Sequence, residues 1–241
     1  LATPDYELVP LMFSWPSDPG ITGMNYDQAR NKQSRISGYD LARFLKEIAA
    51  TTDIGTVHII AHSMGAEVLG YAIEKLGVSG MGLAQAGKAV QPVFRQIVFA
   101  APDVTPRIFS EVIEPAIASN HLVTTYGAST DLPLWLSSIK SREARIGRVA
   151  PGTRLPECVD TVDVTAVTSK GGLSHSTWAE SPRVLDDLRL VLRDGLKPSL
   201  RGLVKRDRVV WALPARAAKG KPASPSPGTA VLRGCGQYSA K

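Results

Sequence analysis

Residues 57–76 read VHIIAHSMGAEVLGYAIEKL, and the spacing of the apolar residues changes in the middle of this stretch. Residues 57–61 form a short, mostly apolar run, which is typical of a strand buried on both faces of a parallel sheet. From Met64 onward the apolar residues recur at intervals of three and four, which is the stripe of an amphipathic helix. The sequence therefore predicts a strand, a tight turn and a helix in direct succession.

Ser63 occupies the predicted turn, within His-Ser-Met-Gly. A sharp strand-to-helix turn lifts a serine hydroxyl above the carboxyl edge of the sheet, an arrangement called a nucleophile elbow. The usual pattern is G-x-S-x-G. Here Ala61 replaces the first glycine and Gly65 is the second, and we expect small residues because the strand and helix backbones approach closely. We predict that Ser63 is a nucleophile; the alternative is a serine that only caps the helix.

Strands and helices are predicted to alternate along the chain, which indicates a parallel sheet with helices on both faces. The predicted strands are residues 9–15, 57–61, 96–101, 121–126 and 159–167. The predicted helices are residues 27–50, 64–76, 106–118, 133–141 and 181–193. We therefore predict an α/β fold, a three-layer α/β/α sandwich with a mostly parallel sheet.

The character of the sequence changes after residue 195, and we expect residues 1–195 to form the catalytic domain. Residues 196–214 keep some apolar side chains and are predicted to pack on that domain as an extension. Residues 215–241 are of low complexity and are predicted to be disordered. Within the domain, residues 77–91 and 141–156 are predicted loops near the rim of the site.

The net charge of +6 is concentrated at the C-terminal end. From residue 196 onward there are ten Lys or Arg residues and one Asp, so this part carries +9 and residues 1–195 carry −3. Its aromatic residues are limited to Trp211 and Tyr238. We therefore expect no specific nucleic-acid partner, because such sites interleave basic and aromatic side chains.

The composition, 241 residues of which 44% are hydrophobic, allows one sizeable core. No apolar run approaches the roughly 18 residues of a membrane helix, and the first residues contain no secretory signal. Because the chain begins with Leu, we expect a processed or truncated chain and assign no compartment. Cys158 and Cys235 lack metal-ligand spacing. Since no phosphate-binding glycine loop is present either, we expect no cofactor and no metal.

A serine nucleophile needs a base and an acid that orients the base. Of the four histidines, His175 alone lies in a glycine-rich loop between the last predicted strand and the last helix of residues 1–195, and it is the predicted base. His58 lies inside the elbow strand, His62 directly precedes the serine, and His121 begins a strand. We expect these three histidines to be structural.

Two carboxylates compete for the role of the acid. Asp131 follows the predicted strand 121–126, and Asp103 follows the predicted strand 96–101. Both therefore emerge at the same sheet edge as Ser63. We prefer Asp131 and keep Asp103 as the alternative acid. For each of them, the competing interpretation is a cap of the following helix.

The negative oxygen that forms during acyl transfer needs two N–H donors. One is predicted to be the backbone N–H of Met64, at the N-terminus of the elbow helix, where the helix dipole favours negative charge. The second donor normally comes from a loop after an earlier strand, often with an H-G motif. No such motif precedes Val9, so the sequence does not identify the second donor.

Taken together, these features resemble the α/β-hydrolase superfamily, and more narrowly a bacterial branch of uncharacterised esterase- and lipase-like hydrolases. The matching segments span about residues 8–195: FSWPSD (13–18), NYD (25–27), LARFLKEIA (41–49), IIAHSMG (59–65), VFAAPDV (98–104), YGASTDLPLWLS (126–137) and LSHS (173–176). The resemblance implies Ser63 as nucleophile, Asp131 as acid and His175 as base.

The resemblance also implies an upstream strand, an H-G-Y-N-like loop and a helix before residue 9. The residues before this position are too few for another strand and a crossover helix. We therefore expect an N-terminally truncated copy in which the second oxyanion donor is missing, with a marginally stable fold and little activity.

The leading functional hypothesis is a serine hydrolase that cleaves a small-molecule carboxylic ester through an acyl-enzyme on Ser63. Thioesters and amides are open to the same chemistry. The alternative is a catalytically impaired hydrolase-like scaffold or fragment that acts as an interaction module, with the basic tail as its contact. The sequence does not predict the oligomeric state.

Overall fold

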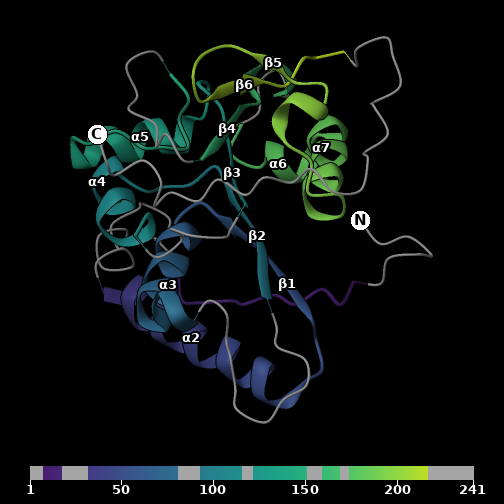
Figure 1. The fold of residues 1–241 in the computed structure, drawn as a ribbon. Coiled ribbons are helices and arrows are strands. Elements are labelled where there is room, and N and C mark those ends of the chain that lie inside the picture. Colours follow the sequence, from purple (N-terminus) through teal and green to yellow (C-terminus); the bar gives the residue numbers. More distant parts are fainter. Residues whose placement is uncertain are drawn as a thin grey trace, which may run out of the picture.

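A six-stranded sheet lies at the centre of the computed structural model, which describes residues 8–17, 32–80, 93–115, 122–150, 159–168 and 174–216 (Figure 1). Its strands are β1 (Thr56–His62), β2 (Val93–Ala100), β3 (Leu122–Gly127), β4 (Asp160–Asp163), β5 (Val204–Lys205) and β6 (Val210–Ala212). Their order in space is β1-β2-β3-β4-β6-β5. All neighbours are parallel except β5, which is antiparallel to β6. The predicted, mostly parallel sheet is confirmed.

The strand β2 shows why these segments form a sheet covered on both sides. Its consecutive residues Ile97, Val98 and Phe99 are all fully buried. Because successive side chains of a strand point to opposite faces, apolar layers must cover both faces of β2.

One face of the sheet is covered by the helices α2 (Ser34–Thr51) and α3 (Gly65–Gly80), and by the short α4 (Pro106–Ile108), which continues into the π-helical turn η2 (Phe109–Ile113). Ile73 of α3 and Phe109 pack with Phe99 in this layer. The helices α2 and α3 approach closely at Gly38, where a Cβ would lie 2.5 Å from the Cβ of Tyr71. A larger residue at position 38 would force these helices apart.

The other face is covered by α6 (Thr177–Glu180) and α7 (Pro182–Leu192). Val184 and Leu188 of α7 pack with Val98 and Val162 of the sheet. Figure 1 shows α2 and α3 on one side of the sheet and α6 and α7 on the other. The expected three-layer arrangement is therefore present. The helix α5 (Leu132–Ser141) begins shortly after the carboxyl end of β3.

The residues that follow α7 continue the sheet. After the 3₁₀ turn η4 (Pro198–Leu200), β6 pairs in parallel with β4, with Thr161 opposite Val210. Arg201, which is buried, places Nη1 3.0 Å from Oδ2 of Asp187 in α7. The hydroxyl of Tyr126 donates to the same oxygen at 2.6 Å. The division of the chain into units at residue 195 stays a prediction, and residues 217–241 lie outside the described residues.

The prediction of a strand at residues 9–15 is wrong. A strand is stable only when a neighbour accepts and donates its ladder hydrogen bonds, and residues 8–17 take part in no strand pairing of the described sheet. Phe13 packs instead on Phe44 of α2, with the ring centroids 6.2 Å apart. Trp15 packs against the same core, whereas Met12 is 91% exposed.

Two further elements are shorter than predicted. The helix expected at residues 106–118 is α-helical only to Ile108 and then widens, so that the N–H of Glu114 bonds to the carbonyl of Phe109 at 2.8 Å. The strand expected at residues 159–167 ends at Asp163. Its Oδ1 accepts the N–H of Thr165 at 2.9 Å and starts the 3₁₀ turn η3 (Thr165–Val167).

The ends of several predicted segments lie outside the described residues. This applies to residues 27–31 of the predicted helix 27–50, to residues 116–118 of the predicted helix 106–118, to residues 81–91 and 151–156 of the two predicted loops, and to His121, Cys158 and Cys235. The regular part of α3 ends at Gly77, which has a φ of 71°, close to the end predicted from the sequence. The short helix α6 was not predicted.

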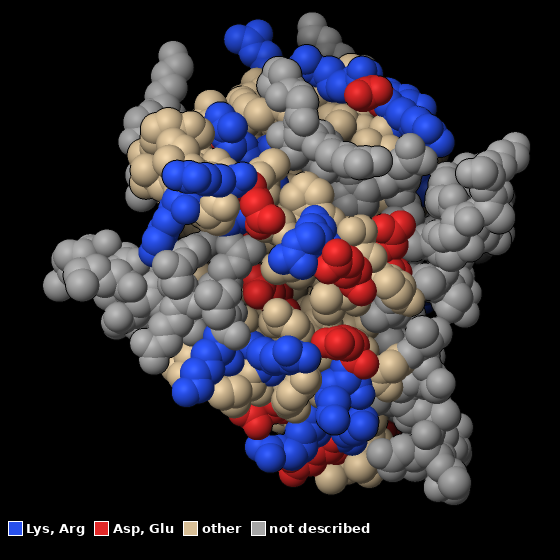
Figure 2. Space-filling view, turned by 90° about the vertical axis from the view of Figure 1, so that its left-hand side faces the viewer, with Lys and Arg blue, Asp and Glu red and all other residues tan. Residues whose placement is uncertain are grey.

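The described surface carries charges of both signs. Figure 2 shows Lys and Arg side chains interleaved with Asp and Glu among the described residues of the face that it presents. In the described ranges, no helix combines the length and the apolar character needed to cross a membrane.

Candidate active site

Ser63 lies at the corner between β1 and α3 in a strained backbone conformation. Its φ is 54°, in the left-handed region that residues other than glycine rarely adopt. The surrounding backbone holds this conformation: the N–H of Ser63 donates to Ala100 at 3.0 Å, and its carbonyl accepts the N–H groups of Ala66 and Asp103 at 3.1 Å each. Such strain persists only where neighbouring contacts determine the conformation, and it is common at nucleophile elbows.

Gly65 does not have the role expected from the sequence. We expected a small residue there because the strand and helix backbones would approach closely. A Cβ at Gly65 would meet no heavy atom of the described residues within 4 Å. Close packing among these residues therefore does not explain this glycine.

Asp131 and His175 form a hydrogen-bonded pair. Oδ2 of Asp131 lies 2.9 Å from Nδ1 of His175. Oδ1 of Asp131 accepts the N–H of Leu134 at 2.9 Å, so the same carboxylate also caps α5. The carboxylate of Asp131 therefore contacts His175 with one oxygen and caps α5 with the other. The side chain of Asp131 is 1% exposed and that of His175 is 16% exposed, which leaves the imidazole accessible beside a shielded carboxylate.

Asp103, the alternative acid, is engaged elsewhere. Its Oδ1 lies 2.6 Å from Nε of Arg145 and accepts the hydroxyl of Ser137 at 2.8 Å. The guanidinium of Arg145 is fully buried and also donates to Ser137. Because this buried cation binds the carboxylate of Asp103, Asp131 and not Asp103 is the carboxylate that contacts His175. Asp103 still supports the elbow through its backbone N–H.

The loop that carries His175 is held by two further contacts. The hydroxyls of Thr130 and Ser174 are 3.1 Å apart. Nε2 of His62 lies 3.2 Å from the carbonyl oxygen of His175. The ring of His62 also packs against the rings of His175 and Trp178, at centroid distances of 4.8 and 5.3 Å. The loop of His175 is therefore held by contacts with the strand that precedes Ser63.

Burial lowers the pKa of His62, and the charge of the neighbouring His175 lowers it further, while the hydrogen bond to the carbonyl of His175 and the charge of Asp131 raise it by smaller amounts. A neutral His62 with its proton on Nε2 can donate to the carbonyl of His175. Burial also lowers the pKa of His58, assisted by Arg95.

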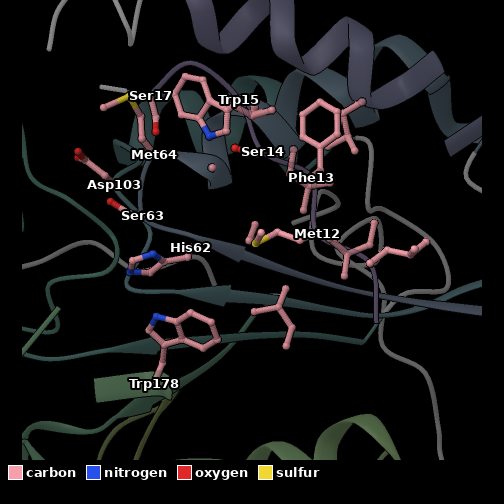
Figure 3. A pocket seen from close by; sticks show the side chains of 18 of the residues that line it. Met12, Phe13, Ser14, Trp15, Ser17, His62, Ser63, Met64, Asp103 and Trp178 are labelled. Carbon is pink, nitrogen blue, oxygen red and sulfur yellow. The ribbon is translucent and has the colours of Figure 1, made fainter. Parts of the chain in front are cut away.

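Ser63 and His175 face one cavity of about 1750 Å³. Figure 3 shows Ser63 and Asp103 together at one end of it, with Trp15 on one side and His62 and Trp178 on the other. Among the contacts of the described residues, no hydrogen bond joins the hydroxyl of Ser63 to His175. In sites without substrate, such bonds are often long and shorten when substrate binds.

The backbone of Met64 lies directly before the first residue of α3, where the helix dipole favours negative charge. Met64 and Ser17 both line the cavity. In the described ranges, no group of three His, Cys, Asp or Glu side chains is arranged to hold a metal ion.

Sequence reasoning did not predict the contacts that hold His175. From the sequence His62 is expected to be structural, yet the direction of β1 aims its side chain at the loop of His175. Its position next to Ser63 was the available signal. The sequence contains no comparable signal for Trp178, because a single aromatic residue is most often part of the core.

Comparison with known proteins gives one match to a protein-family model. Its description reads "Alpha/beta hydrolase of unknown function (DUF900)", and it covers residues 2–193. No curated protein and no solved structure matches the chain significantly.

Proposed function

This chain belongs to the family of alpha/beta hydrolases of unknown function, and we propose that it is a serine hydrolase that cleaves carboxylic esters, with Ser63 as the nucleophile. The observation that carries the proposal is the Asp131–His175 pair, 2.9 Å apart, beside the cavity that Ser63 also lines. A buried carboxylate that holds Nδ1 of an imidazole leaves Nε2 as the acceptor for a serine proton.

The proposed reaction has two halves. In the first, Nε2 of His175 takes the proton of Ser63 while the serine oxygen attacks the ester carbonyl carbon. The carbon–oxygen bond to the alcohol then breaks, and the departing alcohol oxygen receives that proton from His175. In the second half, His175 takes a proton from water while the water oxygen attacks the acyl carbon. The bond from that carbon to the oxygen of Ser63 then breaks, His175 returns the proton to the serine oxygen, and the carboxylic acid leaves.

Each proposed partner has a separate task. Asp131 keeps the proton of His175 on Nδ1 and stabilises the imidazolium that forms. The N–H of Met64 stabilises the negative oxygen of the tetrahedral intermediate. The left-handed backbone of Ser63 presents the hydroxyl at the start of α3, and Met64 and His175 line the same cavity.

Labelling with a fluorophosphonate probe tests the proposal, because such probes react with activated serines. The wild-type chain should be labelled and should hydrolyse p-nitrophenyl butyrate, but slowly, because the sequence supplies no second oxyanion donor. Ser63→Ala should lose the label and several orders of magnitude in kcat. Ser110→Ala, at an exposed position on η2, is the control and should retain both. Equal labelling of the wild type and Ser63→Ala would refute the assignment.

A further inference from the structure

We propose that residues 145–147, which we call the bridging segment, position Ser63 relative to the Asp131–His175 pair. The segment follows α5 and acts through backbone hydrogen bonds and one buried side chain. This inference rests on the proposed ester hydrolysis, and it assigns positioning residues to that reaction.

The bridging segment holds the turn behind the nucleophile. The N–H of Asp103 donates to the carbonyl of Ser63 at 3.1 Å, and Figure 3 shows these two residues side by side. The carbonyl of Pro102 accepts the N–H of Gly147 at 3.1 Å. The carbonyl of Pro102 and the N–H of Asp103 belong to the same peptide group, which is rigid and planar. A displacement of Gly147 therefore reaches Ser63 through a single peptide group.

Gly147 also holds the turn that carries the proposed acid. Its carbonyl accepts the N–H of Ala128 at 3.2 Å, and the carbonyl of Ala128 accepts the N–H of Asp131 at 3.4 Å. Asp131 caps α5 and contacts Nδ1 of His175. Gly147 thus bonds to the turn behind the nucleophile with its N–H and to the turn of the acid with its carbonyl.

The fit around Gly147 leaves no room for a side chain. A Cβ there would lie 2.6 Å from the nitrogen of Pro102 and 2.7 Å from both the oxygen of Pro102 and the carbonyl carbon of Ala101. On the other side, a Cβ at Gly127 would meet the carbonyl oxygen of Gly147. Because all of these atoms belong to the backbone, they cannot rotate away. An added methyl group must displace one of the two turns.

The strained backbone of Ala101 is separate evidence that the turn behind the nucleophile is held tightly. Its φ is 45°, in the same left-handed region as the φ of 54° at Ser63. Such strain persists only where the surroundings determine the conformation, and it is concentrated at functional sites. The N–H of Ala101 donates to Tyr126 at 2.8 Å, and Gly147 packs against its carbonyl group. The bridging segment is therefore part of what maintains this strained turn.

The side chain of Arg145 anchors the bridging segment. Its guanidinium is fully buried, and Nε lies 2.6 Å from Oδ1 of Asp103. Nη2 donates to the hydroxyl of Ser141 at 2.6 Å and to the carbonyl of Ser137 at 3.3 Å. The cation therefore connects the segment to α5, which Asp131 caps, and to the turn of Asp103. Because a buried ion pair is often no more stabilising than apolar residues of similar size, positioning explains this pair better than stability does.

Gly147→Ala tests the proposal, and Gly38→Ala is the matched control. A Cβ at Gly38 would lie 2.5 Å from the Cβ of Tyr71 and 2.8 Å from the carbonyl oxygen of Val68, so this methyl group also meets the backbone, but between α2 and α3. Gly147→Ala should lower kcat for p-nitrophenyl butyrate about a hundredfold, because small displacements of reacting groups are costly, with KM changed little. Gly38→Ala should retain the wild-type kcat once the folded fraction is taken into account. Equal kcat values for the two folded variants would overturn the proposal.

Proton NMR separates positioning from both stability and catalysis. The proton between Nδ1 of His175 and the carboxylate of Asp131 should give a signal far downfield, which Asp131→Asn assigns by removing it. Gly147→Ala should shift or broaden this signal, and Gly38→Ala should leave it unchanged. An unchanged signal in Gly147→Ala would overturn the proposal. Because the signal requires neither substrate nor nucleophile, absence of turnover and of fluorophosphonate labelling in the wild type would refute the proposed function alone.

A milder pair of variants keeps the test decisive if the substitution of the glycine prevents folding. Ser141 and Ser138 are both on α5, and their hydroxyls donate to carbonyls of that helix at 2.9 and 2.7 Å. Among the contacts of the described residues, Ser141 accepts a hydrogen bond from Arg145 and Ser138 does not. Ser141→Ala should lower kcat several-fold and shift the downfield signal, whereas Ser138→Ala should match the wild type. Wild-type kcat and an unchanged signal in Ser141→Ala would overturn the proposal.

Discussion

The imidazole of His62 lies against that of His175, with ring centroids 4.8 Å apart, and Nε2 of His62 is 3.2 Å from the carbonyl oxygen of His175. The residue before the proposed nucleophile thus holds the loop of the proposed base. Because the two histidines belong to different segments of the chain, this contact fixes the position of the His175 loop relative to Ser63.

The first prediction is that His62 positions His175. His62→Leu should lower kcat up to about a hundredfold, because small displacements of a catalytic group are costly, while KM changes little. His62→Gln, which keeps a side-chain N–H donor, should recover part of the loss. Steady-state kinetics on p-nitrophenyl butyrate test this. If both variants retain wild-type kcat, the contact has no role in catalysis.

The second prediction separates the two carboxylates. Asp131→Asn should lower kcat by about 10⁴, as expected when a base loses the partner that sets its tautomer, with little loss of stability because Asn still caps α5. Asp103→Asn should instead leave the buried Arg145 without a full negative partner and destabilise the fold by up to about 3–5 kcal/mol. Kinetics and thermal unfolding of both variants distinguish the roles; the reverse pattern would make Asp103 the acid.

The third prediction concerns pH. Burial and His175 lower the pKa of His62 in the folded protein, whereas an unfolded histidine titrates near about 6.5. Below that pH the unfolded state therefore binds more protons, and the free energy of unfolding falls as the pH falls. The loss is complete once the pH is below the folded pKa of His62.

Thermal unfolding at pH 7.5 and pH 5.5 tests this, and His62→Gln should lose less stability than the wild type over this interval. His58, whose pKa burial also lowers, remains in both proteins and contributes equally to both. Identical losses in the two proteins would show that His62 does not titrate as described.

The fourth prediction concerns the segment after α7. Arg201→Met leaves Asp187 buried without its cation and should cost about 3–5 kcal/mol, or about 10 °C in Tm for a domain of this size. The control is Arg189→Met, because Arg189 and Asp186 form an exposed pair 3.0 Å apart that contributes about 0–1 kcal/mol. Adding Asp187→Leu to Arg201→Met should restore much of the loss. Equal Tm values for Arg201→Met and Arg189→Met would contradict the structural role of this ion pair.

The sequence by itself determined the elements whose signals are local. The change from a continuous apolar run to a three- and four-residue spacing within residues 57–76 predicted β1, the turn at Ser63 and α3. The same local patterns predicted β2, β3, α5 and α7, and with them the parallel sheet. The sequence also identified Asp131 and His175 as candidate site residues, because residues that follow parallel strands meet at one edge of the sheet.

Only the tertiary structure decided the questions that depend on a partner distant in the chain. Residues 9–15 have the composition of a strand but do not pair in the described sheet, since a strand exists only through its neighbour. Asp131 and Asp103 occupy equivalent positions after their strands, and Arg145 distinguishes them by binding Asp103. His62 contacts His175, the proposed base, which is 113 residues away in the chain. Local propensity carries no information on such encounters, because they arise when separately formed segments pack against one another.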